Sequence, residues 1–149
     1  MDKVWDQMKS GAWYDAEDVS LRQLRASCKA KLQQFNAMPE SDRQQAIGIL
    51  YTLLDAQEGL NIEAPFRCDY GPNIHLGRNF YANFNFSVLD EADVTIGDHV
   101  FIGPNVGIYT AIHPLDPKTR RTGLERAEPV RIGDDVWIGG GAQILPGVT

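Results

Sequence analysis

The stretch that sets the fold reads Ile96-Gly97-Asp98-His99-Val100-Phe101-Ile102-Gly103-Pro104-Asn105-Val106-Gly107-Ile108. An isoleucine returns every six residues, and small or polar residues follow the first two. The same period recurs in two other places, at Ile132, Ile138 and Ile144 and, more weakly, at Leu76, Ala82 and Val88. Helical repeats have periods of about 33 residues or more, so the six-residue period excludes them.

A six-residue period suits a chain that winds into triangular coils. Each short strand turns one aliphatic side chain inward, and each corner takes small or polar residues. Stacked coils then bury a continuous apolar column while their backbones pair from coil to coil. Hexapeptide repeats of this kind are typical of a parallel β-helix, a β-solenoid. We expect about three coils beginning near Asn73, with six isoleucines pointing inward: Ile96, Ile102, Ile108, Ile132, Ile138 and Ile144.

The N-terminal part follows a helical period instead. Apolar residues recur at steps of three and four from Leu21 to Phe35, as in an amphipathic helix. Pro39 ends this helix because proline lacks the backbone N–H, and Ser41 suits the start of a second helix that ends near Gly59. The chain is therefore expected to divide into an N-terminal helical segment, residues 1–59, and a β-helix, residues 60–149.

The period also locates an insertion. The anchor due at residue 114 falls at Ile132, 18 residues later. The residues from about 113 to 129 are polar and rich in residues that break regular structure. A loop of this length on a regular scaffold is usually functional or disordered, and its first residue is His113.

Composition narrows the classes of function. The formal net charge of −6 argues against a nucleic-acid partner, since phosphates select basic surfaces. Cys28 and Cys68 lack the spacing of metal ligands, which indicates two reduced thiols and no metal site. The first residues contain no apolar run typical of a signal peptide, and no stretch approaches the length of a membrane span. We therefore expect a cytoplasmic protein without a membrane partner.

Five stretches resemble the maltose/galactoside O-acetyltransferases, a family of hexapeptide-repeat acyltransferases. They are GAWYDA (11–16), PFRCDYG (65–71), NFYANFN (79–85), YTAIHPLD (109–116) and VWIGG (136–140). The resemblance covers essentially the whole chain. It implies a left-handed parallel β-helix, a homotrimer with active sites between subunits, and acetyl transfer to a sugar hydroxyl of the maltose, glucoside or galactoside type. Acetyl-CoA is then a co-substrate and no cofactor is permanently bound.

The resemblance also implies roles for single residues. His113 falls on the family's catalytic histidine, and Asn83 falls on an active-site asparagine that touches both the acceptor and the thioester. Gly140 falls where a backbone group meets CoA. Relatives continue with at least one further coil, so the chain resembles a member that lacks the C-terminal coils.

Acceptor-side positions of the family fall on six residues, namely Asp15, Arg25, Asp69, Tyr81, Asn83 and Glu91. The match at Asp15 and Arg25 is loose by one residue, and Asp90 is an alternative to Glu91.

Several residues also fit structural roles. His75 and His99 suit surface or corner positions, and Asn85 suits a corner in the left-handed conformation that asparagine tolerates. Trp137 suits packing, and Asp69 would also serve to cap a turn.

The chemistry of acetyl transfer explains the need for a histidine. A sugar hydroxyl is not ionised at neutral pH, so its attack on a thioester requires a base, and imidazole titrates in the right range. The tetrahedral intermediate carries an oxyanion, for which backbone amides or the Asn83 amide are suitable donors. Asp116 or a backbone carbonyl is expected to orient the His113 ring.

Two other functions fit the same scaffold. One is a non-catalytic or degenerate trimeric hexapeptide protein. The other is a carbonic-anhydrase-like metalloenzyme, in which three histidines from different subunits bind zinc.

Overall fold

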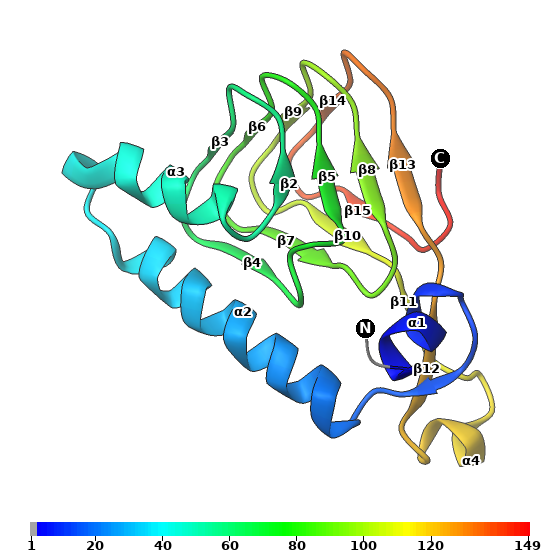
Figure 1. Cartoon of the computed structure of the whole chain (residues 1–149). Coiled ribbons are helices and arrows are strands. Elements are labelled where there is room, and N and C mark those ends of the chain that lie inside the picture. The colour runs from blue at the N-terminus through cyan, green and yellow to red at the C-terminus, as the bar shows by residue number, and fades with distance from the viewer. Residues whose placement is uncertain (1–2) are drawn as a thin grey trace.

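The computed structural model describes residues 3–149, which form an N-terminal helical part and a stack of short strands. The helices are α1 (Lys3–Lys9), α2 (Val19–Ala37) and α3 (Arg43–Tyr51), with a 3-10 turn at Glu40–Asp42. The long helix α2 runs along the outside of the strands, as Figure 1 shows. Asp18 begins α2 by accepting a hydrogen bond from the Ser20 backbone N–H at 2.8 Å. No helix within residues 3–149 combines the length and the apolar character needed to cross a membrane.

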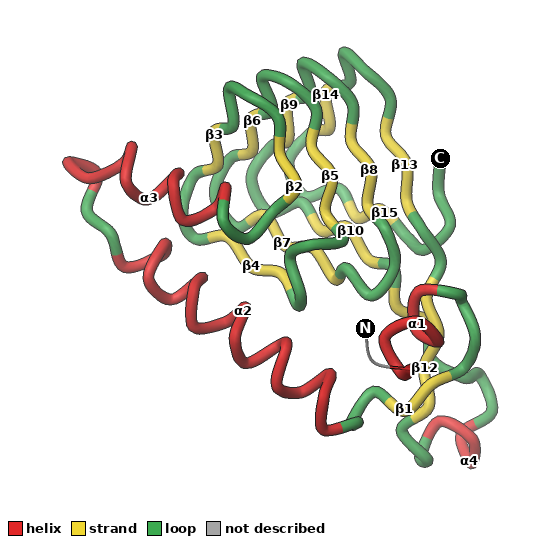
Figure 2. Tube along the Cα trace, in the orientation of Figure 1, coloured by secondary structure: helices red, strands yellow, loops and turns green. Residues whose placement is uncertain are grey.

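The strands form three parallel four-stranded sheets. The first sheet contains β2 (Asp55–Ala56), β5 (Ile74–Leu76), β8 (Val94–Ile96) and β13 (Val130–Ile132). The second contains β3 (Asn61–Ile62), β6 (Tyr81–Ala82), β9 (Phe101–Ile102) and β14 (Trp137–Ile138). The third contains β4 (Phe66–Cys68), β7 (Phe86–Leu89), β10 (Gly107–Tyr109) and β15 (Gln143–Ile144). Along the chain, the strands of these three sheets alternate in a constant order, first sheet, second sheet, third sheet, so the chain winds through four coils (Figure 2).

The coiled region begins at Asp55, ahead of residue 60, and has one coil more than the sequence pattern indicates. The inward residues of this first coil are Ala56, Ile62 and Cys68, which pair in register with Leu76, Ala82 and Val88. They keep the six-residue spacing, but two of the three are small or sulfur-containing. A search for large aliphatic residues at six-residue spacing therefore does not detect this first coil.

The predicted inward anchors line the apolar column. Ile96, Ile102 and Ile108 are at most 2% exposed. Each pairs in register with its counterpart in the fourth coil, in the pairs Ile96–Ile132, Ile102–Ile138 and Ile108–Ile144. The three isoleucines of the fourth coil pack against the same core and stay partly exposed. The six-residue register is confirmed.

Polar residues at two corners adopt the left-handed backbone conformation. Asn79, His99 and Asp135 have φ of 54°, 56° and 57° at one corner of successive coils. Asn85 and Asn105 have φ of 60° and 59° at the next corner. Asparagine and aspartate tolerate this conformation better than most residues. The φ angles of His99 and Asn85 confirm that both residues lie at corners, as expected.

The remaining corner, which joins the third sheet to the first, is larger. Between the first three coils, paired residues are 20 apart, as in Ala56–Leu76 and Leu76–Ile96. Between the third and fourth coils, paired residues are 36 apart, as in Ile96–Ile132. The added residues therefore all lie at this corner, in the loop that follows β10.

The loop after β10 is joined to the N-terminal part by a small antiparallel sheet. The loop contains β11 (Ala111–Ile112), α4 (Pro117–Arg120) and β12 (Leu124–Ala127). Strand β12 lies between β11 and β1 (Tyr14–Asp15), and both pairings are antiparallel. Figure 1 shows this sheet and α1 beside the enlarged corner. The N-terminal segment thus closes over the corner from which His113 emerges.

Candidate active site

Titratable side chains gather at the enlarged corner because successive coils stack there. The turn after β4 carries Asp69, the turn after β7 carries Asp90 and Glu91, and the loop after β10 carries His113 and Glu125. Elsewhere the six-residue rule limits each corner to a few small or polar residues. Within residues 3–149, the longest insertion between paired strands lies at this corner.

Glu91 is a buried acid beside Asp69. The residue is 4% exposed, and its Oε2 lies 3.1 Å from the Thr110 hydroxyl. Burial raises the pKa of Glu91 to about 9, and the hydrogen bond to Asp69 and the negative charges of Asp69 and Glu125 act in the same direction. Glu91 therefore holds a proton at neutral pH and is able to donate a hydrogen bond.

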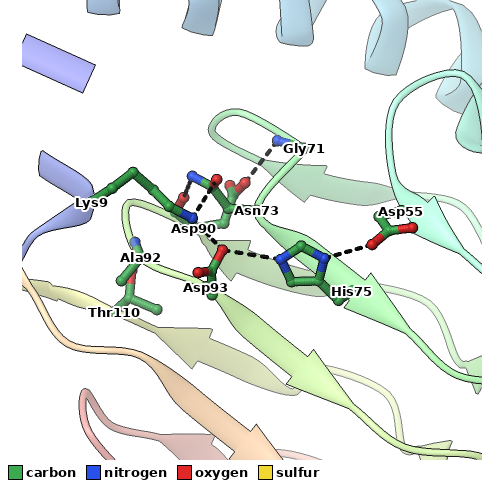
Figure 3. Close-up of polar contacts among 9 residues, drawn as sticks. All are labelled: Lys9, Asp55, Gly71, Asn73, His75, Asp90, Ala92, Asp93 and Thr110. Carbon is green, nitrogen blue, oxygen red and sulfur yellow. Dashed lines mark hydrogen bonds and ion pairs between the residues drawn. The ribbon is translucent and has the colours of Figure 1, made fainter. Parts of the chain in front are cut away.

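Asp90, the alternative to Glu91, has a structural role. It is fully buried, and its two oxygens accept backbone hydrogen bonds from Asp69, Tyr70 and Gly71 at 3.0, 2.9 and 2.7 Å. Figure 3 shows the Asp90 carboxylate aimed at Gly71. Burial raises the pKa of Asp90 to about 6, although the three N–H donors oppose this shift. Asp90 thus shapes the turn that presents Asp69, while Glu91 contacts the Asp69 side chain.

His113 is paired with a carboxylate that the sequence pattern does not predict. It directly follows β11, and its Nε2 lies 3.9 Å from Glu125 Oε2 on β12. The His113 side chain is 63% exposed, whereas that of Glu125 is 11% exposed. Asp116, the expected partner, instead accepts hydrogen bonds from the Thr119 N–H and hydroxyl at 2.8 Å and so begins α4. Glu125, and not Asp116, is therefore the carboxylate that the structure pairs with the His113 ring.

Arg25 reaches the corner from α2. Its guanidinium donates to the Tyr70 hydroxyl and to the Ala16 carbonyl, both at 2.8 Å. Partial burial lowers the pKa of Arg25, but the hydrogen bond to Tyr70 and the charge of Asp69 raise it overall, so the group stays cationic. Asp15 is exposed and accepts a hydrogen bond from the Glu17 N–H at 2.9 Å. On β1 it is the preceding residue, Tyr14, that contacts the corner.

Three other candidate residues line a separate cavity on the second sheet. This cavity has a volume of about 510 Å³ and is lined by Tyr81, Asn83, Phe101, Ile102, Gly103, Pro104, Trp137 and Gly140. Asn83 Oδ1 accepts a hydrogen bond from the Phe84 N–H at 2.8 Å. Trp137, for which packing was expected, is 79% exposed in this chain and forms part of the wall.

The candidate residues therefore form two groups. Asp69, Glu91 and His113 belong to the corner between the third and first sheets, whereas Tyr81 and Gly140 belong to the cavity on the second sheet. In a triangular coil, the second sheet is the side opposite that corner. One chain alone does not bring the two groups together.

The other histidines have structural surroundings. The ring of His75 bridges Asp55 Oδ2 at 2.7 Å and Asp93 Oδ1 at 3.0 Å, and Lys9 of α1 also pairs with Asp93 (Figure 3). Burial lowers the pKa of His75, but the two carboxylates raise it overall. Within residues 3–149, no group of three or more His, Cys, Asp or Glu side chains has the arrangement of a metal site. The cluster links α1 to the first sheet.

The chain matches two sequence families. The maltose acetyltransferase hexapeptide capping motif matches residues 7–56. The hexapeptide repeat of succinyl-transferase matches residues 93–113 and 129–149, on either side of the inserted loop. The two matches correspond to the N-terminal helices and to the later coils.

Individual proteins are similar over nearly the whole chain. Nodulation protein L of Rhizobium meliloti is 46% identical over 145 residues, which are 97% of this chain and 79% of that protein. The structure of a maltose O-acetyltransferase from Clostridium difficile 630 has a TM-score of 0.95 at 44% identity, covering 98% of this chain and 79% of that one. A galactoside acetyltransferase in complex with coenzyme A has a TM-score of 0.93 at 33% identity, covering 99% and 74%. The chain therefore belongs to the maltose/galactoside O-acetyltransferase family of hexapeptide-repeat acyltransferases.

Proposed function

We propose that the protein transfers an acetyl group from acetyl-CoA to a hydroxyl of a sugar of the maltose, glucoside or galactoside type, with His113 as general base. One observation carries this proposal: the exposed His113 ring stands beside the buried Glu125 carboxylate, at a corner that also holds Asp69 and Glu91. The relatives support acetyl-CoA as the donor, since one of them was solved with coenzyme A. Their names, maltose and galactoside acetyltransferase, support a sugar as the acceptor.

The pair of His113 and Glu125 suits removal of a proton from a hydroxyl. As the sugar oxygen bonds to the thioester carbon, its proton passes to the imidazole, and the nearby carboxylate stabilises the resulting cation and orients the ring. The tetrahedral intermediate then collapses, and the C–S bond breaks. The imidazolium returns the proton to the CoA sulfur, which leaves as a thiol.

The corner offers both donors and acceptors to a sugar. Arg25 is a permanent donor, Asp69 is an acceptor, and the protonated Glu91 is able to do either. Neighbouring hydroxyls of a pyranose need this mixture, because each both donates and accepts. Asp15 is included among the acceptor-binding residues on the resemblance alone.

We infer that the second group of residues comes from a neighbouring subunit of a homotrimer of left-handed β-helices. The cavity of Tyr81, Asn83 and Gly140 would then face the His113 corner of the next chain and hold the acetyl-CoA arm. The Asn83 amide would donate to the developing oxyanion. The separation of the two groups within one chain supports this arrangement.

Steady-state kinetics of His113→Ala test the proposal. We expect kcat for acetyl transfer to a maltose-type or galactoside-type acceptor to fall by about 10²–10⁴-fold, the usual contribution of a general base. The Kd of acetyl-CoA should change little, because the cavity proposed to hold the acetyl-CoA arm is lined by other residues and His113 would meet only the thioester end. A wild-type protein that assembles but acetylates none of these sugars would favour the non-catalytic alternative.

A further inference from the structure

Three residues lie in one row across the small sheet that joins the N-terminal segment to the loop. Tyr14 on β1 is paired directly with Glu125 on β12. On the other side of β12, Ile112 is paired with Arg126, so the next position places His113 opposite Glu125. Directly opposed residues of antiparallel strands share a face of the sheet. Tyr14, Glu125 and His113 therefore project to the same side, with the carboxylate in the middle.

The Glu125 carboxylate has a different partner on each oxygen. The Tyr14 hydroxyl donates a short hydrogen bond to Oε1. Oε2 is the oxygen that lies 3.9 Å from His113 Nε2. Because one oxygen is held by the phenol, the direction in which the other oxygen faces is fixed.

Tyr14 is itself rigidly placed. It is 1% exposed and packs in a cluster with Trp5, Met8, Leu21 and Tyr70, apart from the apolar column of the coils. Burial raises the pKa of Tyr14 well above its ordinary value, and the hydrogen bond to Glu125 and the charges of Glu125 and Glu91 raise it further. The phenol therefore stays protonated and acts as a permanent donor.

We propose that Tyr14 is a positioning residue for acetyl transfer, whose hydroxyl holds the Glu125 carboxylate in place and aimed at His113. This inference rests on the proposed roles of His113 and Glu125. A buried polar group requires a hydrogen-bond partner, and the Tyr14 hydroxyl supplies one to Glu125, a residue that is 8% exposed. The N-terminal segment then contributes to the reaction through the Tyr14 hydroxyl, in addition to offering Arg25 to the sugar and covering the coils.

The test is Tyr14→Phe, which removes the hydroxyl and keeps the buried ring. We expect kcat to fall by about 10-fold or more, the effect of losing one hydrogen bond to a charged group. The KM of the sugar and the Kd of acetyl-CoA should change by less than about twofold, since Tyr14 is screened from both by Glu125. The pH profile of kcat/KM should move in the same direction as it does in Glu125→Gln.

A double-mutant cycle tests whether Tyr14 acts on the reaction through Glu125. In the Glu125→Gln background, Tyr14→Phe should lower kcat by less than about twofold further, because the carboxylate on which it acts is already gone. Equal losses in both backgrounds would overturn the inference, as would wild-type kcat and pH profile in Tyr14→Phe alone.

The matched control is Leu21→Val, which loosens the same buried cluster without touching a hydrogen bond. It should lower the melting temperature and leave kcat and its pH profile unchanged. If Leu21→Val reproduces the kinetic effect of Tyr14→Phe, the role of Tyr14 is structural and the inference fails. If His113→Ala retains its activity, the proposed function fails, whatever Tyr14→Phe shows.

Discussion

Glu91→Gln is expected to stabilise the protein, and to do so more strongly as the pH rises. The wild-type side chain is buried with its proton, so the folded state binds that proton more tightly than the unfolded chain does. Its contribution to stability is complete below the ordinary pKa of 4.5 and is lost as the pH rises toward 9. Glutamine keeps the shape, offers Asp69 an N–H donor, and does not titrate.

The magnitude follows from the two pKa values. At pH 7 the unfolded chain ionises Glu91, whereas the folded chain keeps it protonated, across a gap of about 2.5 pH units. At about 1.4 kcal/mol per unit, the wild type loses about 3 kcal/mol that Glu91→Gln retains. Between pH 5 and pH 8 the stability difference between the two proteins should therefore widen by about 1.4 kcal/mol per unit.

Urea unfolding at several pH values, at one fixed protein concentration, measures this slope. Glu58→Gln is the matched control, because it makes the same chemical change at a side chain that is 82% exposed. A difference between Glu91→Gln and wild type that stays constant from pH 5 to pH 8 would show that Glu91 is ionised in the folded protein. The assignment of Glu91 as a hydrogen-bond donor to the acceptor sugar would then be wrong.

Two further predictions concern the coils and the assembly. Ile102→Ala should cost about 2–5 kcal/mol in urea unfolding, because Ile102 is 1% exposed in the apolar column. Ile144→Ala should cost less, since Ile144 is partly exposed, and equal costs would contradict the burial gradient. Because His113 and Asn83 are proposed to act from different subunits, mixed trimers of His113→Ala and Asn83→Ala should regain about a quarter of the wild-type activity. Refolded mixtures that stay inactive would place both residues in the same chain's site.

The coils were predictable because a buried column demands one large aliphatic residue at a constant spacing. Ile96, Ile102 and Ile108 satisfy that demand, and all three are buried. The first coil was missed because Ala56 and Cys68 fill the same inward positions with smaller side chains. The need to point one residue inward every six positions sets the period, but the inward side chain does not have to be large.

Glu125 was not predictable in the same way. It acquires its position from antiparallel pairing between β12 and two other short strands, one of which lies more than a hundred residues earlier in the chain. Strands β1 and β11 have two residues each, too few to show the alternation that marks a strand in sequence. The choice between Asp90 and Glu91 likewise depends on which of the two side chains accepts hydrogen bonds from backbone N–H groups. The sequence of these two adjacent acids does not indicate this.

The enlarged corner explains why chemistry and regular structure are separated in this fold. A coil that repeats every 20 residues leaves little room for inserted residues within its sheets. Each strand residue there is paired with a residue of the next coil, and the inward side chains fill the core. Residues added at a corner do not disturb the pairing on either side, as the 36-residue step between the third and fourth coils shows. Longer turns therefore accumulate at one corner, and stacking brings their side chains together. The N-terminal segment then packs over this corner. It places the Tyr14 hydroxyl against Glu125 and helps to shield Glu91 and Glu125 from solvent.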